Sequence, residues 1–344
     1  MPRSLSAGLV LALALVALPA CGDDDDTPDG GPDPDPDASG DDILGQLAAL
    51  PGVTVDEYTP SPEAIVEGYR YFHLWFTSPV DHEDASAGTF QQYVGLMHRD
   101  VTAPLVAYTG GYDAGWTYYR TEPARVLDSN QISIEYRFYA DSQPATVDWS
   151  KLTVAQASAD EHEILHALGS IYTGAVITTG GSKGGETALQ HYRLYPDDVD
   201  GVVAYVAPVI TDLPDLRYAG VLDEIGLPAC RARLRAVQRA LLERHVDIET
   251  LATAEPGVTY DRAGVAHATE TAIVELEFAF WMTRGEVDCD QVPEATASDG
   301  ELYQFLIDSY SDPAAYGDAS LRVSGSQYIY QDMLELGYPI WMHA

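Results

Sequence analysis

The residues best suited to chemistry lie in segment 180–184, whose sequence is GGSKG. An apolar, β-branched run precedes it at 175–179, and a stretch compatible with a helix follows at 186–195. A serine on a sharp strand-to-helix turn is lifted clear of the backbone, as in the G-x-S-x-G pattern. We therefore predict that Ser182 is a nucleophile and that the Lys183 backbone N–H stabilises a developing oxyanion. The alternative is a glycine-rich turn with an incidental serine.

A second motif, His162-Glu163-x-x-His166, has the spacing with which zinc peptidases place two histidines and a glutamate base on one helix. The longer form of that pattern needs a third histidine where this chain has Tyr172. The apolar residues of the segment form one helical stripe, and the two histidines project from the opposite face. We predict solvated surface histidines and no metal or other cofactor, with zinc chemistry as the alternative.

The segment GGSKGG and the residues YPDDVDGVVAYVAP at 195–208 resemble serine peptidase family thirty-seven, the secreted bacterial tripeptidyl aminopeptidases of the α/β-hydrolase fold. Further segments are similar to that family in the same order, at 68–82, 88–100, 122–139, 148–162 and 229–242. The resemblance covers residues 43–338. It implies a serine aminopeptidase that releases tripeptides from peptides with a free N-terminus.

The elements that must position Ser182 alternate between strands and helices. We predict strands at 69–76, 89–97, 105–109, 133–139, 175–179 and 202–207, and a helix at 158–168. This alternation indicates a mostly parallel sheet covered on both faces. In an α/β-hydrolase the second oxyanion donor follows the third strand, so the backbone amides of Gly111 and Tyr112 are candidates. Glu135 is a candidate partner for the cationic N-terminus of a substrate.

Helical periodicity dominates the chain after Pro208. The resemblance implies that this block is a helical cap inserted into an α/β-hydrolase sheet. The domains expected are therefore a core at 43–210, a cap at 211–338 and a tail at 339–344.

A serine nucleophile needs a histidine base and a carboxylate that orients it. The resembled family carries both in segments that follow its cap, and neither segment occurs in this sequence. His343 has no predicted strand to position it and is given no role. We expect the C-terminal strands to be missing and turnover to be impaired. The alternative is a non-catalytic lipoprotein that binds peptides.

Residues 1–21 have the features of a bacterial export signal, with Arg3, a short apolar run at 7–20, and Cys21 directly after small residues. The run is too short to span a bilayer. We predict that Cys21 is the lipidated mature N-terminus, and a plain secretory signal is the alternative. Residues 22–42 carry ten aspartates and no basic residue, which predicts a disordered tether. The expected location is the bacterial cell envelope or the medium.

Charge and cysteine content restrict the partners. The net charge is −36, and Lys151 and Lys183 are the only lysines in the sequence, so nucleic acid is excluded and a membrane is reached only through a lipid anchor. If Cys21 is lipidated, Cys230 and Cys289 remain as a pair in an oxidising compartment. Their disulfide would stabilise the fold by roughly 4 kcal/mol. Two buried free thiols are the alternative.

Overall fold

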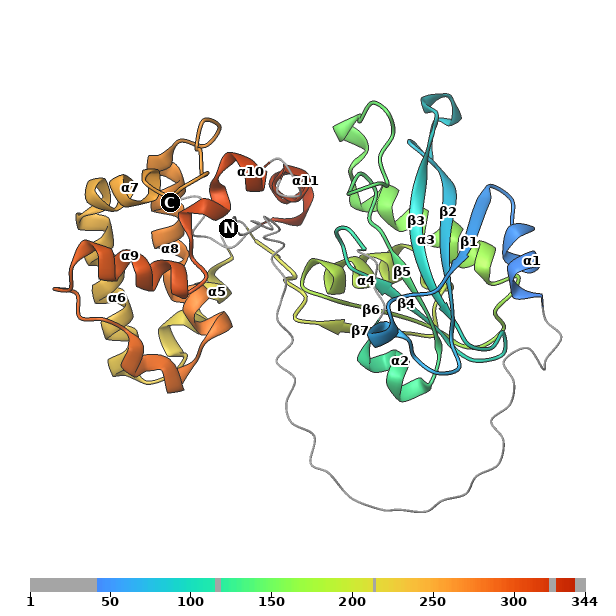
Figure 1. Ribbon diagram of the computed structural model, residues 1–344, viewed down its shortest axis with the longest axis horizontal. Coiled ribbons are helices and arrows are strands. Elements are labelled where there is room, and N and C mark those ends of the chain that lie inside the picture. Colours follow the sequence, from blue (N-terminus) through green and yellow to red (C-terminus); the bar gives the residue numbers. More distant parts are fainter. Residues whose placement is uncertain (1–41, 115–118, 213–214, 322–325, 338–344) are drawn as a thin grey trace, which may run out of the picture. The chain divides into compact units, whose positions relative to one another are not determined.

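The protein divides into two compact units. The structure is a computed structural model that describes residues 42–114, 119–212, 215–321 and 326–337. An α/β unit extends to Val209, and a helical unit begins at Ile210 (Figure 1).

Several predictions concern residues outside these ranges. They are the export signal, the lipidation of Cys21, nearly all of the acidic tether at 22–42, and His343. Within the described ranges, no helix is long and apolar enough to cross a membrane.

The α/β unit is built on a seven-stranded mixed sheet in the order β1-β2-β3-β5-β4-β6-β7. The strands are β1 (Val53–Tyr58), β2 (Arg70–Pro79), β3 (Thr89–His98), β4 (Leu105–Thr109), β5 (Asn130–Ile134), β6 (Val176–Gly181) and β7 (Gly201–Tyr205). Strands β1, β2, β3 and β5 pair antiparallel in that order. Strands β5, β4, β6 and β7 are parallel neighbours. Parallel neighbours need crossover connections, and these carry helices, which confirms the predicted α/β class.

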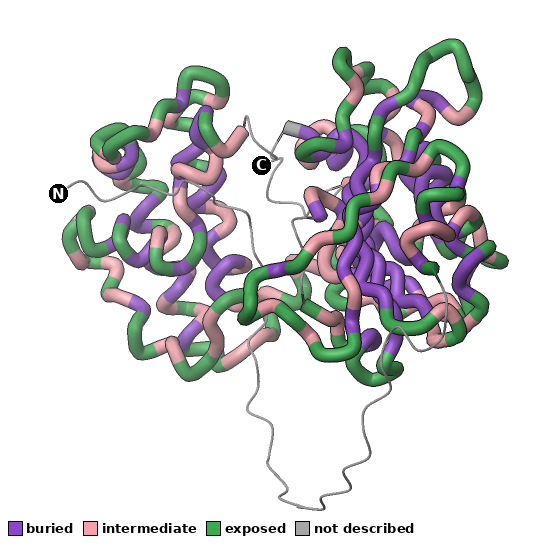
Figure 2. The backbone as a smooth tube through the Cα atoms, turned by 45° about the vertical axis from the view of Figure 1, so that its right-hand side comes forward, coloured by how far each residue is buried: buried purple, intermediate pink, exposed green. Residues whose placement is uncertain are grey.

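Four helices accompany this sheet: α1 (Ile43–Ala48), α2 (Glu122–Leu127), α3 (Val154–Leu168) and α4 (Lys183–Leu194). Short 3₁₀ segments lie at η1 (Pro62–Ala64), η2 (Ala85–Ala87) and η3 (Trp149–Lys151). Helices α3 and α4 pack against each other, and α4 also packs on β4, β6 and β7. The buried residues of this unit concentrate along the sheet strands and the inner face of α3 (Figure 2). The sheet therefore gives α4, and the residue before it, a rigid support.

Three details of the predicted sheet are wrong. It was expected to be mostly parallel, but three of its six strand pairs are antiparallel. The strand expected at 133–139 is β5, which ends at Ile134. After it the chain turns sharply, because Phe138 and Ala140 have positive φ and the Phe138 N–H donates to the Ser142 carbonyl at 2.8 Å. Strand β1 at 53–58 was not predicted, although its exposure alternates over most of its length. A strand that pairs only with β2 at the sheet edge gives a weak sequence signal.

The helical unit contains no strand among its described residues. Its helices are α5 (Leu216–Glu224), α6 (Pro228–Glu243), α7 (His245–Thr253), α8 (Val265–Thr283), α9 (Asp299–Asp308), α10 (Asp318–Ser320) and α11 (Ser326–Gln331). Irregular helical segments lie at η4 (Glu286–Gln291), η5 (Pro313–Tyr316) and η7 (Asp332–Leu336). Helix α8 packs against α6, α7 and α9, and it buries Ala268, Ala272 and Leu276 on its inner face. Small residues one turn apart allow these helices to approach closely.

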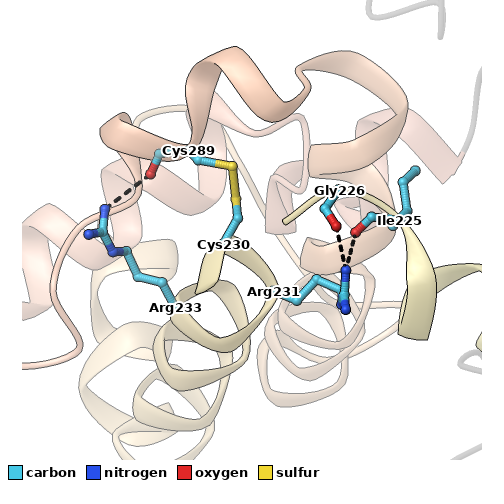
Figure 3. The surroundings of a disulfide bond; sticks show 6 residues. All are labelled: Ile225, Gly226, Cys230, Arg231, Arg233 and Cys289. Atoms are coloured by element: carbon cyan, nitrogen blue, oxygen red, sulfur yellow. Dashed lines mark hydrogen bonds between the residues drawn. A yellow bond between two sulfur atoms is a disulfide. The ribbon is translucent and has the colours of Figure 1, made fainter. Parts of the chain in front are cut away.

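The predicted disulfide is present in the helical unit. Cys230 in α6 and Cys289 in η4 are bonded, with their Cα atoms 5.5 Å apart (Figure 3). The neighbouring Arg233 donates to the Cys289 carbonyl at 3.1 Å, so the same segment is held by a second contact. The bond spans a sequence separation of 59 residues. Closing a loop of that length is worth roughly 4 kcal/mol in the chain-entropy account.

Candidate active site

Ser182 occupies a sharp turn between β6 and α4. Its backbone has φ 54° and ψ −128°, a conformation that is strained for a residue with a side chain. The turn is held because the Ser182 N–H donates to the Tyr205 carbonyl at 2.9 Å and its carbonyl accepts from the Glu186 N–H at 3.1 Å. A serine before a helix usually caps it, but the Ser182 side chain makes no capping hydrogen bond. The hydroxyl is therefore presented rather than used in the helix.

The flanking glycines are required by close backbone contacts. A Cβ at Gly184 would lie 2.1 Å from the Thr109 carbonyl oxygen, and one at Gly180 would lie 2.4 Å from the Gly184 carbonyl. A Cβ at Gly185 would be 2.9 Å from the carbonyl oxygens of Gly180 and Tyr205. Gly184 and Gly185 are thus needed for the same reason as Gly180, because α4 closely approaches the ends of β4, β6 and β7.

The loop after β4 lies against the start of α4. Gly111 has φ 75°, and a Cβ there would be 2.9 Å from the backbone nitrogen of Gly184 and 3.0 Å from the Lys183 carbonyl carbon. The structure therefore brings Gly111 and Tyr112 to the turn that carries Ser182. An oxyanion hole takes one backbone donor from each of two such segments, and the assignment of these donors stays a prediction.

The Lys183 side chain is a feature of this site that the sequence did not predict. The residue is 2 % exposed, and its Nζ donates to the Gly111 carbonyl at 2.5 Å. Nζ also lies 3.5 Å from the centroid of the Tyr136 ring. The pattern of segment 180–184 predicts the backbone position of Lys183, but it gives no sign that the side chain turns inward.

Glu135 has a local structural role. Its carboxylate accepts from Ser142 Oγ at 2.7 Å, from the Ser142 N–H at 3.0 Å and from the Ala114 N–H at 3.3 Å. Burial raises the pKa of this carboxyl. Because its oxygens hold the turn after β5, Glu135 is a weaker candidate for a substrate amine than the sequence suggested.

The histidines of the H-E-x-x-H motif are arranged differently from the prediction. His166 is exposed as predicted, and so is Glu163, but His162 is half-buried and its Nδ1 lies 2.8 Å from an Asp198 carboxylate oxygen. The exposure of Glu163 was not itself predicted. The same carboxylate lies 3.0 Å from Nε2 of the buried His191 in α4. No group of three or more His, Cys, Asp or Glu residues in the described ranges could hold a metal ion. Asp198 thus joins α3 to α4, and the prediction of full solvation is wrong for His162.

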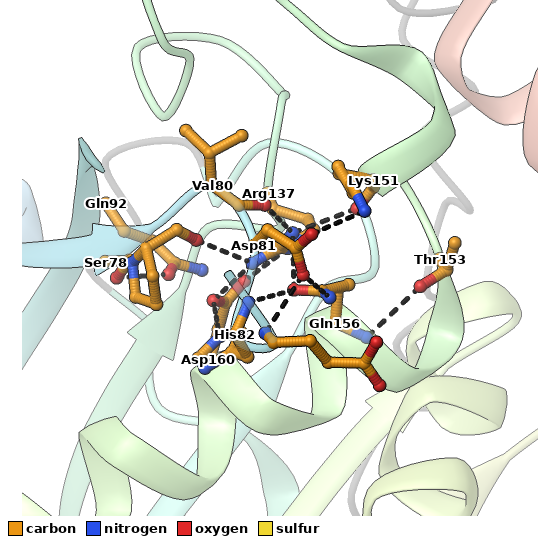
Figure 4. Close-up of polar contacts among 12 residues, drawn as sticks. Ser78, Val80, Asp81, His82, Gln92, Arg137, Lys151, Thr153, Gln156 and Asp160 are labelled. Atoms are coloured by element: carbon orange, nitrogen blue, oxygen red, sulfur yellow. Dashed lines mark hydrogen bonds and ion pairs between the residues drawn. The ribbon is translucent and has the colours of Figure 1, made fainter. Parts of the chain in front are cut away.

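A buried ion network lies at the beginning of α3 (Figure 4). The Arg137 guanidinium is fully buried and donates to both oxygens of Asp160, each at 2.7 Å. Asp160 also lies 2.7 Å from Nε2 of His82, and Asp81 accepts from Gln156 at 2.7 Å. Sequence reasoning missed this network, because its members come from three separate segments. It fixes α3, and α4 packs against α3.

A base for Ser182 is not provided by the residues that the structure describes, since none of them is hydrogen-bonded to the Ser182 hydroxyl. Five of the six described histidines of the α/β unit are engaged elsewhere: His73 with Tyr93, His98 with Tyr172, His82 with Asp160, and His162 and His191 with Asp198. The sixth, His166, is exposed on α3. The expectation that the triad histidine and aspartate are missing stays a prediction.

Strand order and the strained serine together define the class. A sheet in which β5, β4, β6 and β7 run parallel, with a glycine-flanked serine between β6 and α4, is the core of an α/β-hydrolase. Residues 35–344 match the family model described as PS-10 peptidase S37. The chain belongs to that peptidase family.

Two curated relatives are similar to this chain. The prolyl tri/tetrapeptidyl aminopeptidase of Streptomyces mobaraensis is 40% identical over 304 residues, a match that covers 87% of this chain and 62% of that protein. A protein of Caenorhabditis elegans named prolyl carboxy peptidase like protein 5 is 24% identical over 222 residues, which covers 58% of this chain and 43% of that protein. The chain therefore spans less than two thirds of the length of each relative.

Solved structures with a similar arrangement include two hydrolases. The rice cell wall degrading esterase LipA from Xanthomonas oryzae is 12% identical, with a TM-score of 0.33 and 77% of each chain covered. The peroxisomal α/β-hydrolase Lpx1 from Saccharomyces cerevisiae is 13% identical, with a TM-score of 0.29, 79% of this chain and 68% of that chain covered. Because both TM-scores are low, the fold assignment rests on the strand order and the family match.

Proposed function

We propose that this protein is an exported serine aminopeptidase that releases short peptides, specifically tripeptides, from free N-termini. The observation that carries the proposal is the backbone of Ser182, held at φ 54° at the end of β6 with its side chain not used as a helix cap. A strained backbone conformation is maintained only by over-determining contacts, and here those contacts come from three strands. The name of the Streptomyces relative supports the substrate class.

The geometry assigns separate roles to the two segments. Ser182 Oγ would attack the scissile carbonyl carbon, and the carbonyl oxygen would become an oxyanion. The Lys183 N–H at the start of α4 and the Tyr112 N–H would stabilise that charge, because both belong to the adjoining segments 111–112 and 183–184. Removing one such donor typically costs about 10²-fold to 10³-fold in turnover.

Slow turnover is part of the proposal. An alcohol is a weak nucleophile until a base removes its proton, and no described histidine contacts Ser182. Loss of a triad partner typically lowers turnover on the order of 10⁴-fold or more. What remains would come from the oxyanion donors and from substrate binding.

Export is proposed from two observations. The Cys230–Cys289 disulfide is suited to an oxidising compartment, and the first 21 residues have the composition of an export signal. Lipid on Cys21 would then anchor the protein in the cell envelope. Mass spectrometry of the membrane fraction checks this: a lipidated peptide that begins at Cys21 is expected, and a mature protein that begins elsewhere would remove the anchor.

The substrate proposal is tested with chromogenic tripeptides in two forms, one with a free N-terminus and one acetylated. The wild-type chain should release the chromophore slowly from the free form alone, and Ser182→Ala should remove this activity. Equal cleavage of both forms would contradict the aminopeptidase assignment. Activity that survives Ser182→Ala and disappears in Glu163→Gln would instead support zinc chemistry.

A non-catalytic peptide-binding protein is the second candidate, favoured by the lack of a described base at Ser182. It would bind the same free tripeptides with measurable affinity and release no product. Calorimetric titration beside the chromogenic assay separates the two candidates.

A further inference from the structure

Lys183 is buried at a place where a lysine is unfavourable. It is the first residue of α4 and only 2 % exposed. A cation at a helix N-terminus faces the positive end of the helix dipole, which costs about 0.3–1 kcal/mol, and removing an ammonium from water costs more. Lys151, the other lysine, keeps a partly exposed side chain and pairs with Asp81. The position of Lys183 therefore has to be held by specific contacts.

Those contacts come from the loop after β4 and the turn after β5. Lys183 Nζ donates to the Gly111 carbonyl at 2.5 Å and lies 3.5 Å from the Tyr136 ring centroid. The rings of Tyr112 and Tyr139 are also near, with centroids 5.4 Å and 5.6 Å from Nζ. A desolvated ammonium over an aromatic face gains about 2 kcal/mol. The buried carboxyls of Glu161 and Glu186 also interact electrostatically with Lys183. The aromatic cage and these groups offset the burial, and the ammonium donates to the Gly111 carbonyl.

That carbonyl belongs to the peptide unit that ends in the Tyr112 N–H. A trans peptide is planar, with its C=O and N–H pointing in opposite directions, so a group that fixes the Gly111 oxygen also fixes the Tyr112 N–H. The next peptide is held as well, because the Tyr112 carbonyl accepts from the Tyr136 N–H at 2.9 Å. A Cβ on Gly111 would lie 2.9 Å from the Gly184 nitrogen, so this peptide lies beside the serine turn.

We infer that the Lys183 side chain is a positioning group for the oxyanion hole. One residue then serves both halves of the hole: its backbone N–H is one donor, and its ammonium orients the peptide that supplies the other. This role rests on the proposed function for its chemical consequence, but the orientation of the peptide is a structural claim in its own right. It also explains why a lysine follows the nucleophile.

The experiment uses the full chain with Lys183→Met, Lys183→Gln and, as a matched control, Lys151→Met. Crystal structures report the direction of the Gly111 carbonyl, and the rate of labelling by a fluorophosphonate reports the oxyanion hole. In Lys183→Met the carbonyl has lost its donor, so the Gly111–Tyr112 peptide should rotate and labelling of Ser182 should slow about 10²-fold. Lys183→Gln keeps an N–H donor and should retain most of both properties. Lys151→Met should match the wild type.

Two results would overturn the inference. One is an unchanged Gly111 carbonyl and labelling rate in Lys183→Met. The other is an equal loss in Met and Gln variants, which would show that charge or packing matters rather than hydrogen-bond donation. If Lys183→Met does not fold, the crystal structure of Lys183→Gln decides. The inference requires that the introduced amide donates to the Gly111 carbonyl, and a structure without that hydrogen bond would overturn it. If wild-type Ser182 is not labelled at all, the proposed function fails, while the crystal structures still decide the positioning role.

Discussion

The serine turn at 180–185 and the H-E-x-x-H segment of α3 both match catalytic patterns in the sequence, but their backbone conformations and side-chain contacts differ. Ser182 has a strained backbone and makes no cap, and the glycines around it are packed against carbonyl groups. His162 and His166 lie on a regular helix, one paired with Asp198 and the other exposed. The difference teaches that a motif is the stronger functional hypothesis where the fold also holds its backbone away from the preferred conformation.

The two segments also differ in what the neighbouring charged groups do. Beside the serine turn, the buried Lys183 donates to the Gly111 carbonyl in a loop. Beside the histidines, Asp160 joins α3 to Arg137 and His82. The arrangement beside the histidines stabilises the fold. The arrangement beside the serine turn orients a loop of the candidate site. Each can be disturbed separately.

Asp160→Asn should give the largest effect. It leaves the fully buried Arg137 guanidinium without its counter-charge, which typically destabilises a protein by about 3–5 kcal/mol. Urea unfolding of the variant measures the loss. The control is Glu163→Gln on the exposed face of α3, which should change stability by less than about 0.5 kcal/mol. Similar values for the two variants would show that the network does not support α3.

Gly184→Ala should come next. The added Cβ would meet the Thr109 carbonyl oxygen at 2.1 Å, so the serine turn must open, at a cost of about 3 kcal/mol, and Ser182 labelling should be lost. Gly181→Ala is the matched control, because its nearest non-neighbouring atom would be 4.0 Å away. If both variants keep labelling, the tight approach of α4 is not what presents the serine.

Glu186→Gln should reveal a pH dependence at the serine turn. Burial raises the pKa of Glu186 from 4.5 to about 7, against the lowering effect of Lys183. Its folded-state pKa lies above the unfolded value, so its contribution to stability is present below pH 4.5 and is lost as the pH rises to about 7. The variant should therefore gain stability over the wild type at pH 8 and match it near pH 4. Unfolding free energies at the two pH values provide the check.

His191→Gln should have a smaller effect on the pH dependence of stability, and this effect should have the opposite sign. Burial lowers the pKa of His191 below 6.5, and the neighbouring Asp198 only partly offsets this. The folded state therefore keeps the ring neutral, and wild-type stability should fall as the pH drops below 6.5. The fall should be shallower in the variant, as thermal unfolding between pH 5 and pH 7.5 would record. An identical slope would mean that His191 does not titrate with folding.

Much of the α/β unit could be predicted because its signals are local. The run at 175–179 and the glycines after it specify a strand and a turn, and strand 105–109 matches β4 in full. The Cys230–Cys289 pairing followed from a count of three cysteines. The inward turn of Lys183 and the Arg137–Asp160 pair could not be predicted, since both depend on side chains that only the folded sheet brings together. A charged side chain that is buried leaves no periodic pattern in the sequence.

The most direct test of the account is the site of covalent attachment after prolonged incubation of the 344-residue protein with a fluorophosphonate. Digestion and mass spectrometry should place the adduct on Ser182, with no adduct in Ser182→Ala and an unchanged one in His162→Asn. A protein that carries no adduct at Ser182, or one whose adduct disappears with His162, would contradict the claim that the serine turn, and not α3, is the reactive centre.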